Sequence, residues 1–261
     1  MPSFKPVTAV VRALTILRIV NSLGSATLKQ LHQESRLHPS TILRMLETLI
    51  HERYVERDPL DGTYSATGKT LLLSNGFESG NRLSRIAGPH LQRLRQRIGW
   101  PSDLAVLDGD AMLILLTSRE FNVVALNHKP GARASLFGSS LGRAYLAFCD
   151  ADTRDRLMAD LLASERGRRS YGISSRRKLE QLVATVRKNG YATPDPDFNR
   201  SSGAGLATGF SVPVLAGDRA VASLSVAFLE SALTMKQAVA TLLPPLRETA
   251  TTLGKAIAPE S

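Results

Sequence analysis

The stretch that most constrains the fold runs from residue 26 to residue 67, because two short helices and a hairpin are predicted there in close succession. Residues 27–35 form a helical segment, residues 36–39 interrupt it, and Ser40 is expected to cap a second helix over residues 41–53. The apolar residues of the second helix recur at helical spacing and are Ile42, Met45, Leu46, Leu49 and Ile50.

A hairpin is predicted directly after this second helix. Two β-prone runs, residues 54–57 and 62–66, flank the turn Asp58-Pro59-Leu60-Asp61-Gly62, and Asp-Gly is a strong signal for a tight hairpin. Helix, turn, helix and hairpin in this order predict a winged helix-turn-helix, whose second helix enters the major groove of DNA. Spacing alone also leaves open an ordinary helical hairpin. The residues that face outwards near the start of the second helix are Ser40, Thr41, Leu43 and Arg44.

These residues resemble a known family. Residues 39–49, with the sequence Pro-Ser-Thr-Ile-Leu-Arg-Met-Leu-Glu-Thr-Leu, look like the recognition helix of the IclR family of bacterial transcription regulators. Residues 11–17 resemble the first helix of that family. The resemblance implies double-stranded operator DNA as a partner, with side chains read at base edges and others at phosphates. The DNA-binding residues expected on this basis are Lys29, Pro39, Ser40, Thr41, Leu43, Arg44, Thr48 and Arg57.

Composition and charge fit a nucleic-acid partner without deciding the matter. The chain has 261 residues, of which 43% are apolar, so it is long enough for two domains with real cores. Its net charge of +10 suits a polyanion, but most of the basic excess falls after residue 78. An RNA-binding module is a weaker alternative, because an aromatic content of 5% leaves few side chains on which bases could stack.

A single cysteine, Cys149, excludes an internal disulfide and a multi-cysteine zinc site, and we expect neither a metal nor a cofactor. No run of about 18 uninterrupted apolar residues is present, so no membrane span is predicted. The first residues lack a charged region followed by an apolar one, which is the pattern of a secretory signal. We therefore expect a cytoplasmic protein.

Further helices are predicted on both sides of the helix-turn-helix. Residues 7–23 form an amphipathic helix that is expected to cover its back with Val10, Ala13, Leu14, Leu17 and Val20. Residues 67–83 are predicted as a linker helix and residues 83–98 as a second long helix. The boundary is placed near residue 80. Residues 7–78 then hold the DNA-binding domain with the start of the linker helix, and residues 80–261 form a second domain.

The second domain shows a mixed pattern of helices and strands. Strands are predicted at residues 103–107, 111–116, 121–127, 207–215 and 221–229, and helices at residues 141–148, 153–162, 174–189 and 234–257. Hairpin signals at both ends of this region favour a mainly antiparallel sheet flanked by helices. The fold class predicted for the whole chain is therefore α+β.

The resemblance continues through this domain. Residues 100–104, 142–149 and 231–234 look like one IclR subgroup, which is typified by activators of hydroxyphenylpropionate and related aromatic-acid catabolism. It implies a GAF-like effector-binding domain, a homodimer or tetramer, and a small organic acid as the effector of a regulator of a catabolic operon. The identity of the acid stays open, because function depends on the site and not on the fold.

The start of the predicted helix at residue 141 is the expected effector site. Free N–H groups and the helix dipole favour a carboxylate there. The family's effector position, carried over to this sequence, makes Ser140 and Leu141 the backbone donors, next to Ser139. The remaining positions supply apolar walls, strand residues and a loosely aligned acid, and they are Val123, Leu126, Ala134, Leu206, Thr208, Ser225 and Asp197.

One pattern near this helix also suggests an enzyme. Residues 138–142 fit the G-x-S-x-G motif of serine hydrolases, which requires a histidine after the serine in the chain. All five histidines precede Ser140, so this order is absent. A cytoplasmic hydrolase-like enzyme that uses Ser140 is the alternative from another class. The glycine-rich residues 203–209 lack the spacing of a dinucleotide loop. We expect the chain not to be an enzyme.

Overall fold

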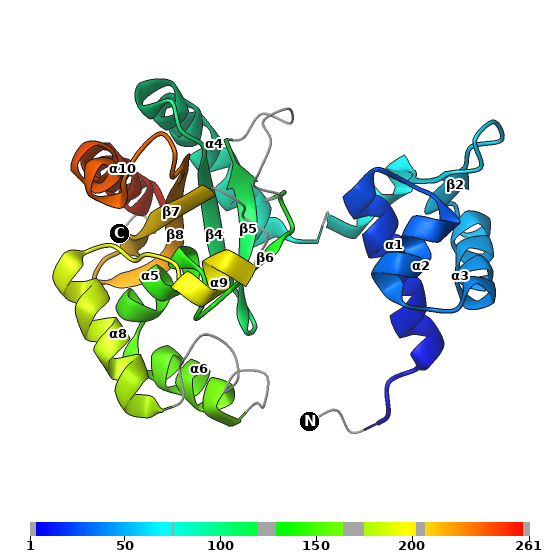
Figure 1. Cartoon of the computed structure of the whole chain (residues 1–261), viewed down its shortest axis with the longest axis horizontal. Helices are drawn as coiled ribbons and strands as arrows, with labels where there is room; N and C mark the ends of the chain where they lie inside the picture. Colours follow the sequence, from blue (N-terminus) through cyan, green and yellow to red (C-terminus); the bar gives the residue numbers. More distant parts are fainter. Residues whose placement is uncertain (1–3, 75, 119–128, 164–174, 202–206, 258–261) are drawn as a thin grey trace. The chain divides into compact units, whose positions relative to one another are not determined.

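The computed structural model describes residues 4–74, 76–118, 129–163, 175–201 and 207–257. The chain divides into two compact units, Met1–Glu78 and Ser79–Ser261, which are drawn in Figure 1 and are described separately.

The first unit combines three helices with a small antiparallel sheet of strand order β1-β3-β2. Its elements are α1 (Thr8–Leu23), β1 (Ser25–Ala26), α2 (Leu28–Ser35), α3 (Pro39–His51), β2 (Val55–Arg57), β3 (Tyr64–Ala66) and the 3-10 helix η1 (Gly68–Ser74). Thr27 and Gln30 form a capping box at the start of α2, which fixes where this helix begins. The core contains the buried residues Ile16, Val20, Leu31, Ile42, Leu46, Leu49, Val55 and Tyr64. This order of elements agrees with the predicted winged helix-turn-helix.

The recognition-type helix α3 begins and ends two residues earlier than predicted. His38, and not Ser40, is the cap, because its Nδ1 accepts a hydrogen bond from the Ser40 amide at 3.4 Å. Pro39 occupies the first helical position, where its fixed φ fits a helix and its missing N–H costs nothing. The helix ends at His51, since Arg53 has a left-handed φ of 60°.

The packed side of α1 also differs from the prediction. Val10 and Leu14 are 54% and 60% exposed, whereas Ile16, Leu17, Ile19 and Val20 are buried. The core of the unit reaches only the second half of α1, and apolar spacing along the helix does not reveal where the covering elements stop.

The linker is interrupted where one helix over residues 67–83 was predicted. The short η1 is followed by a turn at Gly76, and α4 (Glu78–Ile98) then runs through the expected break at residue 83. Leu71, Leu72 and Leu73 are all exposed, so these three leucines do not pack into the core of this unit.

The second unit is built on one antiparallel sheet with the strand order β6-β5-β4-β8-β7. Its strands are β4 (Ser102–Asp108), β5 (Ala111–Thr117), β6 (Arg133–Ser135), β7 (Ala207–Ala216) and β8 (Arg219–Leu229). Its helices after α4 are α5 (Ser140–Phe148), α6 (Ala151–Ala163), α8 (Arg176–Asn189), α9 (Pro196–Ser201) and α10 (Met235–Ile257). The predicted α+β fold with a mainly antiparallel sheet is confirmed. Strand β6 and helix α9 were not predicted, and the strand expected at residues 121–127 lies outside the described residues.

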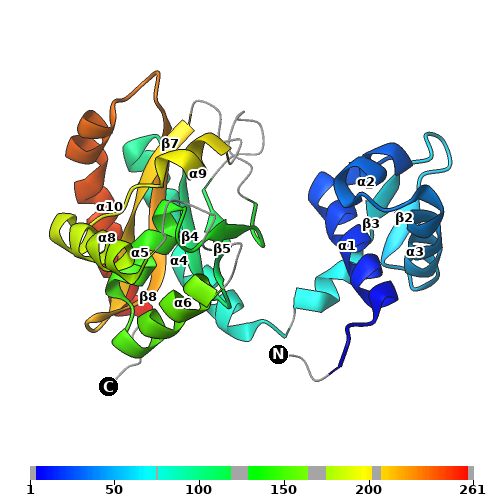
Figure 2. The same cartoon turned by 60° about the horizontal axis from the view of Figure 1, so that its bottom comes forward.

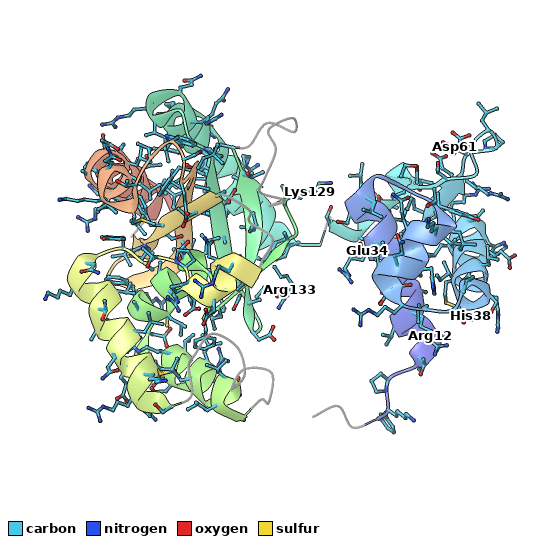
Figure 3. The ribbon with its side chains drawn as sticks, in the orientation of Figure 1. Arg12, Glu34, His38, Asp61, Lys129 and Arg133 are labelled. Carbon is cyan, nitrogen blue, oxygen red and sulfur yellow. The ribbon has the colours of Figure 1, made fainter. Side chains whose placement is uncertain are left out.

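Helices cover both faces of this sheet. Helices α4 and α10 pack on one face, and α5, α6 and α8 lie on the other, as Figures 1 and 2 show. Because side chains alternate along a strand, Leu224 and Val226 of β8 face α4 and α10, whereas Ser223 and Ser225 face α5. At the sheet edge, Arg133 of β6 forms ion pairs with Asp108 and Asp110 of the β4–β5 turn (Figure 3).

Cys149 ends α5 as a buried residue, and burial raises the pKa of its thiol to about 11. The thiol is therefore protonated at neutral pH and unreactive in the folded unit. Among the described residues, no helix is long and apolar enough to cross a membrane, and no three His, Cys, Asp or Glu side chains converge as a metal site would require.

Candidate functional site

The outer face of α3 carries most of the predicted DNA-binding residues. Ser40, Leu43 and Arg44 are exposed, and they lie opposite the buried Ile42 and Leu46. Of the other predicted residues, Lys29, Thr48 and Arg57 are exposed, and Pro39 and Thr41 are half-buried. The structure thus leaves an exposed stripe along α3, polar except for Leu43, that a base edge or a phosphate could approach.

Sequence reasoning missed one residue on this stripe. Glu47 is exposed three residues after Arg44, so the two side chains lie on the same face of the helix. A carboxylate there can accept a hydrogen bond from the amino group of cytosine, as an arginine can donate to guanine. Helical spacing could have revealed it. The Thr48 hydroxyl, by contrast, donates to the carbonyl of Arg44 at 2.9 Å and is held within the helix.

The hairpin turn between β2 and β3 carries negative charge. The Asp58 and Asp61 carboxylates accept the amides of Leu60 and Thr63, and the Thr63 amide and hydroxyl lower the pKa of Asp61. Figure 3 labels Asp61 in this turn, whose Leu60 is 95% exposed. Arg57 lies at the base of the hairpin, with its guanidinium 5.8 Å from the centroid of the Tyr64 ring. Contact with phosphate is therefore favoured at the base of the hairpin and disfavoured at its tip.

In the second unit, the N-terminus of α5 presents two backbone donors. Ser139 is the cap: its hydroxyl accepts the Gly142 amide at 3.1 Å and donates to the Ser135 carbonyl at 2.6 Å. Within the described chain, the amides of Ser140 and Leu141 donate to no other group. Two N–H groups and the positive end of the helix dipole thus converge at one point.

Polar side chains continue from this point across the sheet. The Ser211 hydroxyl on β7 donates to the Ser140 hydroxyl at 2.8 Å. Ser211 is directly opposite Ser225 on β8, which is directly opposite Asp103 on β4. All three strand residues are buried on the face that α5 covers. Two strand spacings place Asp103 about 10 Å from Ser211. The Asp103 carboxylate therefore lies at a distance from the N-terminus of α5.

Some of the predicted effector residues are not brought to this point. Thr208 is two residues before Phe210 on β7, so both side chains lie on the same face of the sheet. That face packs against α4 and α10 and is opposite to the face of Ser225. Asp197 is exposed and forms an ion pair with Arg200. Ala134 is buried in the core beneath α5. Three predicted wall residues lie outside the described residues, namely Val123, Leu126 and Leu206.

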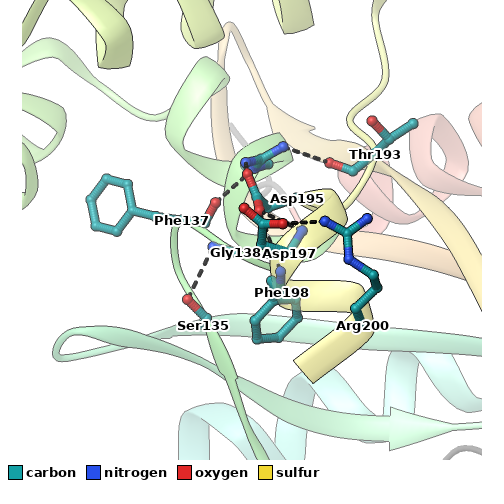
Figure 4. A network of polar contacts seen from close by, with 9 residues as sticks. Ser135, Phe137, Gly138, Thr193, Asp195, Asp197, Phe198 and Arg200 are labelled. Atoms are coloured by element: carbon teal, nitrogen blue, oxygen red, sulfur yellow. Dashed lines mark hydrogen bonds and ion pairs between the residues drawn. The ribbon is translucent and has the colours of Figure 1, made fainter. Parts of the chain in front are cut away.

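A buried ion pair lies behind the α5 N-terminus and was not predicted. The Arg143 guanidinium donates to a carboxylate oxygen of Asp195 at 2.7 Å, and Figure 4 shows Asp195 within this network. Burial lowers the pKa of Arg143, and the Asp195 carboxylate opposes that shift. A lone arginine inside the apolar run of residues 141–148 is the signal that could have predicted a partner, because a buried charge is rarely unpaired.

Two family models match the chain. The one described as IclR helix-turn-helix domain matches residues 9–59, and the one described as bacterial transcriptional regulator IclR C-terminal matches residues 79–255. The chain belongs to the IclR family. The winged unit is therefore the DNA-binding domain of a transcriptional regulator, and the second unit is its ligand-binding domain. Regulators of this kind are not enzymes, which removes the hydrolase alternative for Ser140.

Curated relatives agree with this placement. The chain is 27% identical over 239 residues to the HTH-type transcriptional regulator BhcR of Paracoccus denitrificans, covering 87% of this chain and 85% of that one. It is 26% identical to the Pca regulon regulatory protein of Pseudomonas putida, over 74% of this chain and 66% of that one.

Solved structures share the fold. An IclR homolog from Microbacterium hydrocarbonoxydans, complexed with 4-hydroxybenzoate, superposes with a TM-score of 0.68 at 23% identity, covering 95% of this chain and 98% of that one. The IclR of Thermotoga maritima gives a TM-score of 0.67 at 19% identity, over 96% and 98% of the two chains. At these identities the likeness establishes the fold alone.

The position of α5 depends on Gly142. A Cβ there would lie 2.1 Å from the Leu136 carbonyl oxygen, which real contacts do not allow, so Gly142→Ala must push α5 away from the preceding turn. We expect Gly142→Ala to lower the free energy of unfolding of the second unit by about 1–3 kcal/mol in urea denaturation.

Gly88→Ala in α4 is the matched control. It has open space around the new methyl group, and it should be neutral or stabilising by up to about 1 kcal/mol. Equal stability of Gly142→Ala and the wild type would show that the turn before α5 can move without cost.

Proposed function

We propose that this regulator controls a catabolic operon, reading its operator with α3 and sensing a small, aromatic organic acid at the N-terminus of α5. The domains proposed are residues 7–78 for DNA and residues 80–261 for the acid. The observation that carries the sensing half is the pair of Ser140 and Leu141 amides, which donate to no other group within the described chain and stand beside the hydroxyls of Ser140 and Ser211. Such a group of donors is suited to a carboxylate.

The aromatic character of the acid is supported by the surroundings of this point and by the relatives. The buried cluster that contains Leu141 of α5 is mainly apolar, and it also includes Leu136 and Phe137. A planar apolar body with one charged end fits such a wall. One structural relative was solved with 4-hydroxybenzoate, and one sequence relative is named for the Pca regulon.

For operator recognition, Ser40, Leu43 and Arg44 are proposed at base edges, together with Thr41 beside them. Lys29, Thr48 and Arg57 are proposed to support them at the DNA backbone, and Pro39 is proposed to lie at the same interface. The acidic turn at Asp58 and Asp61 restricts this support to the base of the hairpin. Because helix-turn-helix proteins usually bind two half-sites, we expect a homodimer or tetramer on one operator.

Arg44→Ala tests whether α3 is the recognition helix. The side chain is exposed and opposite the core, so its loss should cost about 1–3 kcal/mol of specific DNA binding and leave the fold intact. Fluorescence anisotropy at fixed salt, with a DNA fragment from beside the protein's own gene, measures the change.

Arg93→Ala is the matched control, because it removes the same charge from an exposed position on α4. It should leave DNA affinity within error of the wild type. If Arg44→Ala binds the fragment as tightly as Arg93→Ala does, α3 is not the recognition helix.

Ser140→Asp tests the acid site. A fixed carboxylate at this position occupies the space of the ligand and repels it, and like charges about 4 Å apart at an effective dielectric near 20 cost about 4 kcal/mol. Calorimetry with benzoate, 4-hydroxybenzoate and acetate should therefore detect binding to the wild type and none to the variant. DNA affinity should be kept, because an acid near a helix N-terminus is locally favourable.

Ser231→Asp makes the same chemical change at an exposed position and should bind the acid normally. Equal acid affinity in Ser140→Asp and Ser231→Asp would move the site away from α5. A wild type that binds none of these acids would contradict the sensing half of the proposal.

A further inference from the structure

The ion pair of Arg143 and Asp195 joins segments that are 52 residues apart. Only 10% and 14% of the two side chains are exposed, so both charges lie almost entirely inside the protein. A buried ion pair adds little net stability on average, because desolvation offsets the attraction between the charges. What this pair provides is a fixed geometry, which its other contacts define.

Each partner holds several backbone groups. Arg143 donates through Nε to the Phe137 carbonyl at 2.6 Å and through a terminal nitrogen to the Thr193 carbonyl at 3.4 Å. The Asp195 amide donates to the Gly138 carbonyl at 2.8 Å. Two consecutive carbonyls of the turn that leads into α5 are therefore held by this one pair (Figure 4).

The second oxygen of Asp195 reaches a different element. It accepts the amides of Asp197 at 2.9 Å and Phe198 at 3.3 Å, which lie in the first turn of α9. One carboxylate thus caps α9 and also binds the arginine that stands inside α5. The start of α9 and the turn before α5 cannot move independently while this carboxylate is in place.

We propose that Asp195, acting through Arg143, is a positioning residue of the acid site. The pair fixes Phe137 and Gly138, this turn ends in the cap residue Ser139, and the direction of the two donor amides follows from the cap. It sets ligand affinity without touching the ligand. This inference rests on the proposed acid site at the α5 N-terminus.

Charge and geometry predict opposite results when the carboxylate is neutralised. Asp195→Asn keeps the size and the oxygen that caps α9, but it leaves the Arg143 guanidinium buried without its counter-ion. If the pair acted through charge alone, the unbalanced cation three residues after Ser140 would tighten binding of an acid. If it acts by positioning, the turn loosens and binding weakens, which is the result that we expect.

The test compares Arg143→Lys with Arg187→Lys. Lysine keeps the positive charge but cannot hold three acceptors in a planar fork. Arg187 is the matched control, because it also donates through Nε to a carbonyl of α5, that of Ala147, at 2.6 Å, but near the other end of the helix. Calorimetry with 4-hydroxybenzoate, benzoate and acetate gives the acid affinity of each variant.

Two further readouts separate positioning from loss of the fold. The rate at which a thiol reagent labels the buried Cys149 reports opening of the second unit, since this residue ends α5. DNA affinity reports the other unit. We expect Arg143→Lys and Asp195→Asn to weaken acid binding about tenfold, with Cys149 protected and DNA affinity unchanged, and Arg187→Lys to match the wild type.

Wild-type affinity in Arg143→Lys, or tighter binding in Asp195→Asn, would overturn the positioning role while leaving the acid site standing. If Arg143→Lys loses the protection of Cys149, Asp195→Asn decides alone, because it preserves the shape of the side chain. A wild type that binds no acid, with Cys149 protected, would overturn the acid site and this inference together.

Discussion

The second unit depends on one close approach of backbone to backbone, between Gly142 of α5 and the carbonyl of Leu136. It allows α5 to begin directly over the turn that precedes it, and it leaves no room for a side chain. The position at which the helix starts determines three features. These are the cap at Ser139, the donor amides of Ser140 and Leu141, and the contact with Ser211 on β7. A ligand site at a helix N-terminus needs this rigidity, because its donors are backbone groups that move only with the helix.

In the DNA-binding unit, too, the packing of one helix fixes the position of the proposed recognition groups. One face of α3 is buried through Ile42, Leu46 and Leu49, and this packing leaves the opposite face exposed, where we propose that it meets DNA. The negative turn of the hairpin and the arginine at its base bias where the backbone of the duplex can approach. In the function proposed here, recognition in this unit depends on exposed side chains, whereas recognition in the other depends on backbone amides at the start of α5.

Sequence reasoning predicted what is local and missed what depends on long-range contacts. The helix-turn-helix, the Asp-Gly hairpins and the α5 N-terminus follow from spacing and turn chemistry over a few residues. The apolar run around Arg143 indicates that this arginine needs a partner, but Asp195 could not be predicted as that partner, because spacing says nothing about which segments fold together. Thr208 was grouped with Ser225 on the family resemblance, and the sequence alone does not reveal the pairing register that places the two side chains on opposite faces of the sheet. The cap at His38 was missed because Ser40 is the better cap by residue type, and Pro39 decided otherwise.

The measurement that tests the account most directly is acid binding to the free protein and to its complex with DNA. A regulator that couples the two sites must satisfy linkage, so the factor by which the acid changes DNA affinity equals the factor by which DNA changes acid affinity. The probes are a DNA fragment from beside the protein's own gene and 4-hydroxybenzoate. We expect the acid to change DNA affinity about fivefold or more, and DNA to change acid affinity by the same factor. Specific DNA binding that the acid leaves unchanged, with equal acid affinity in the free and bound protein, would contradict the account.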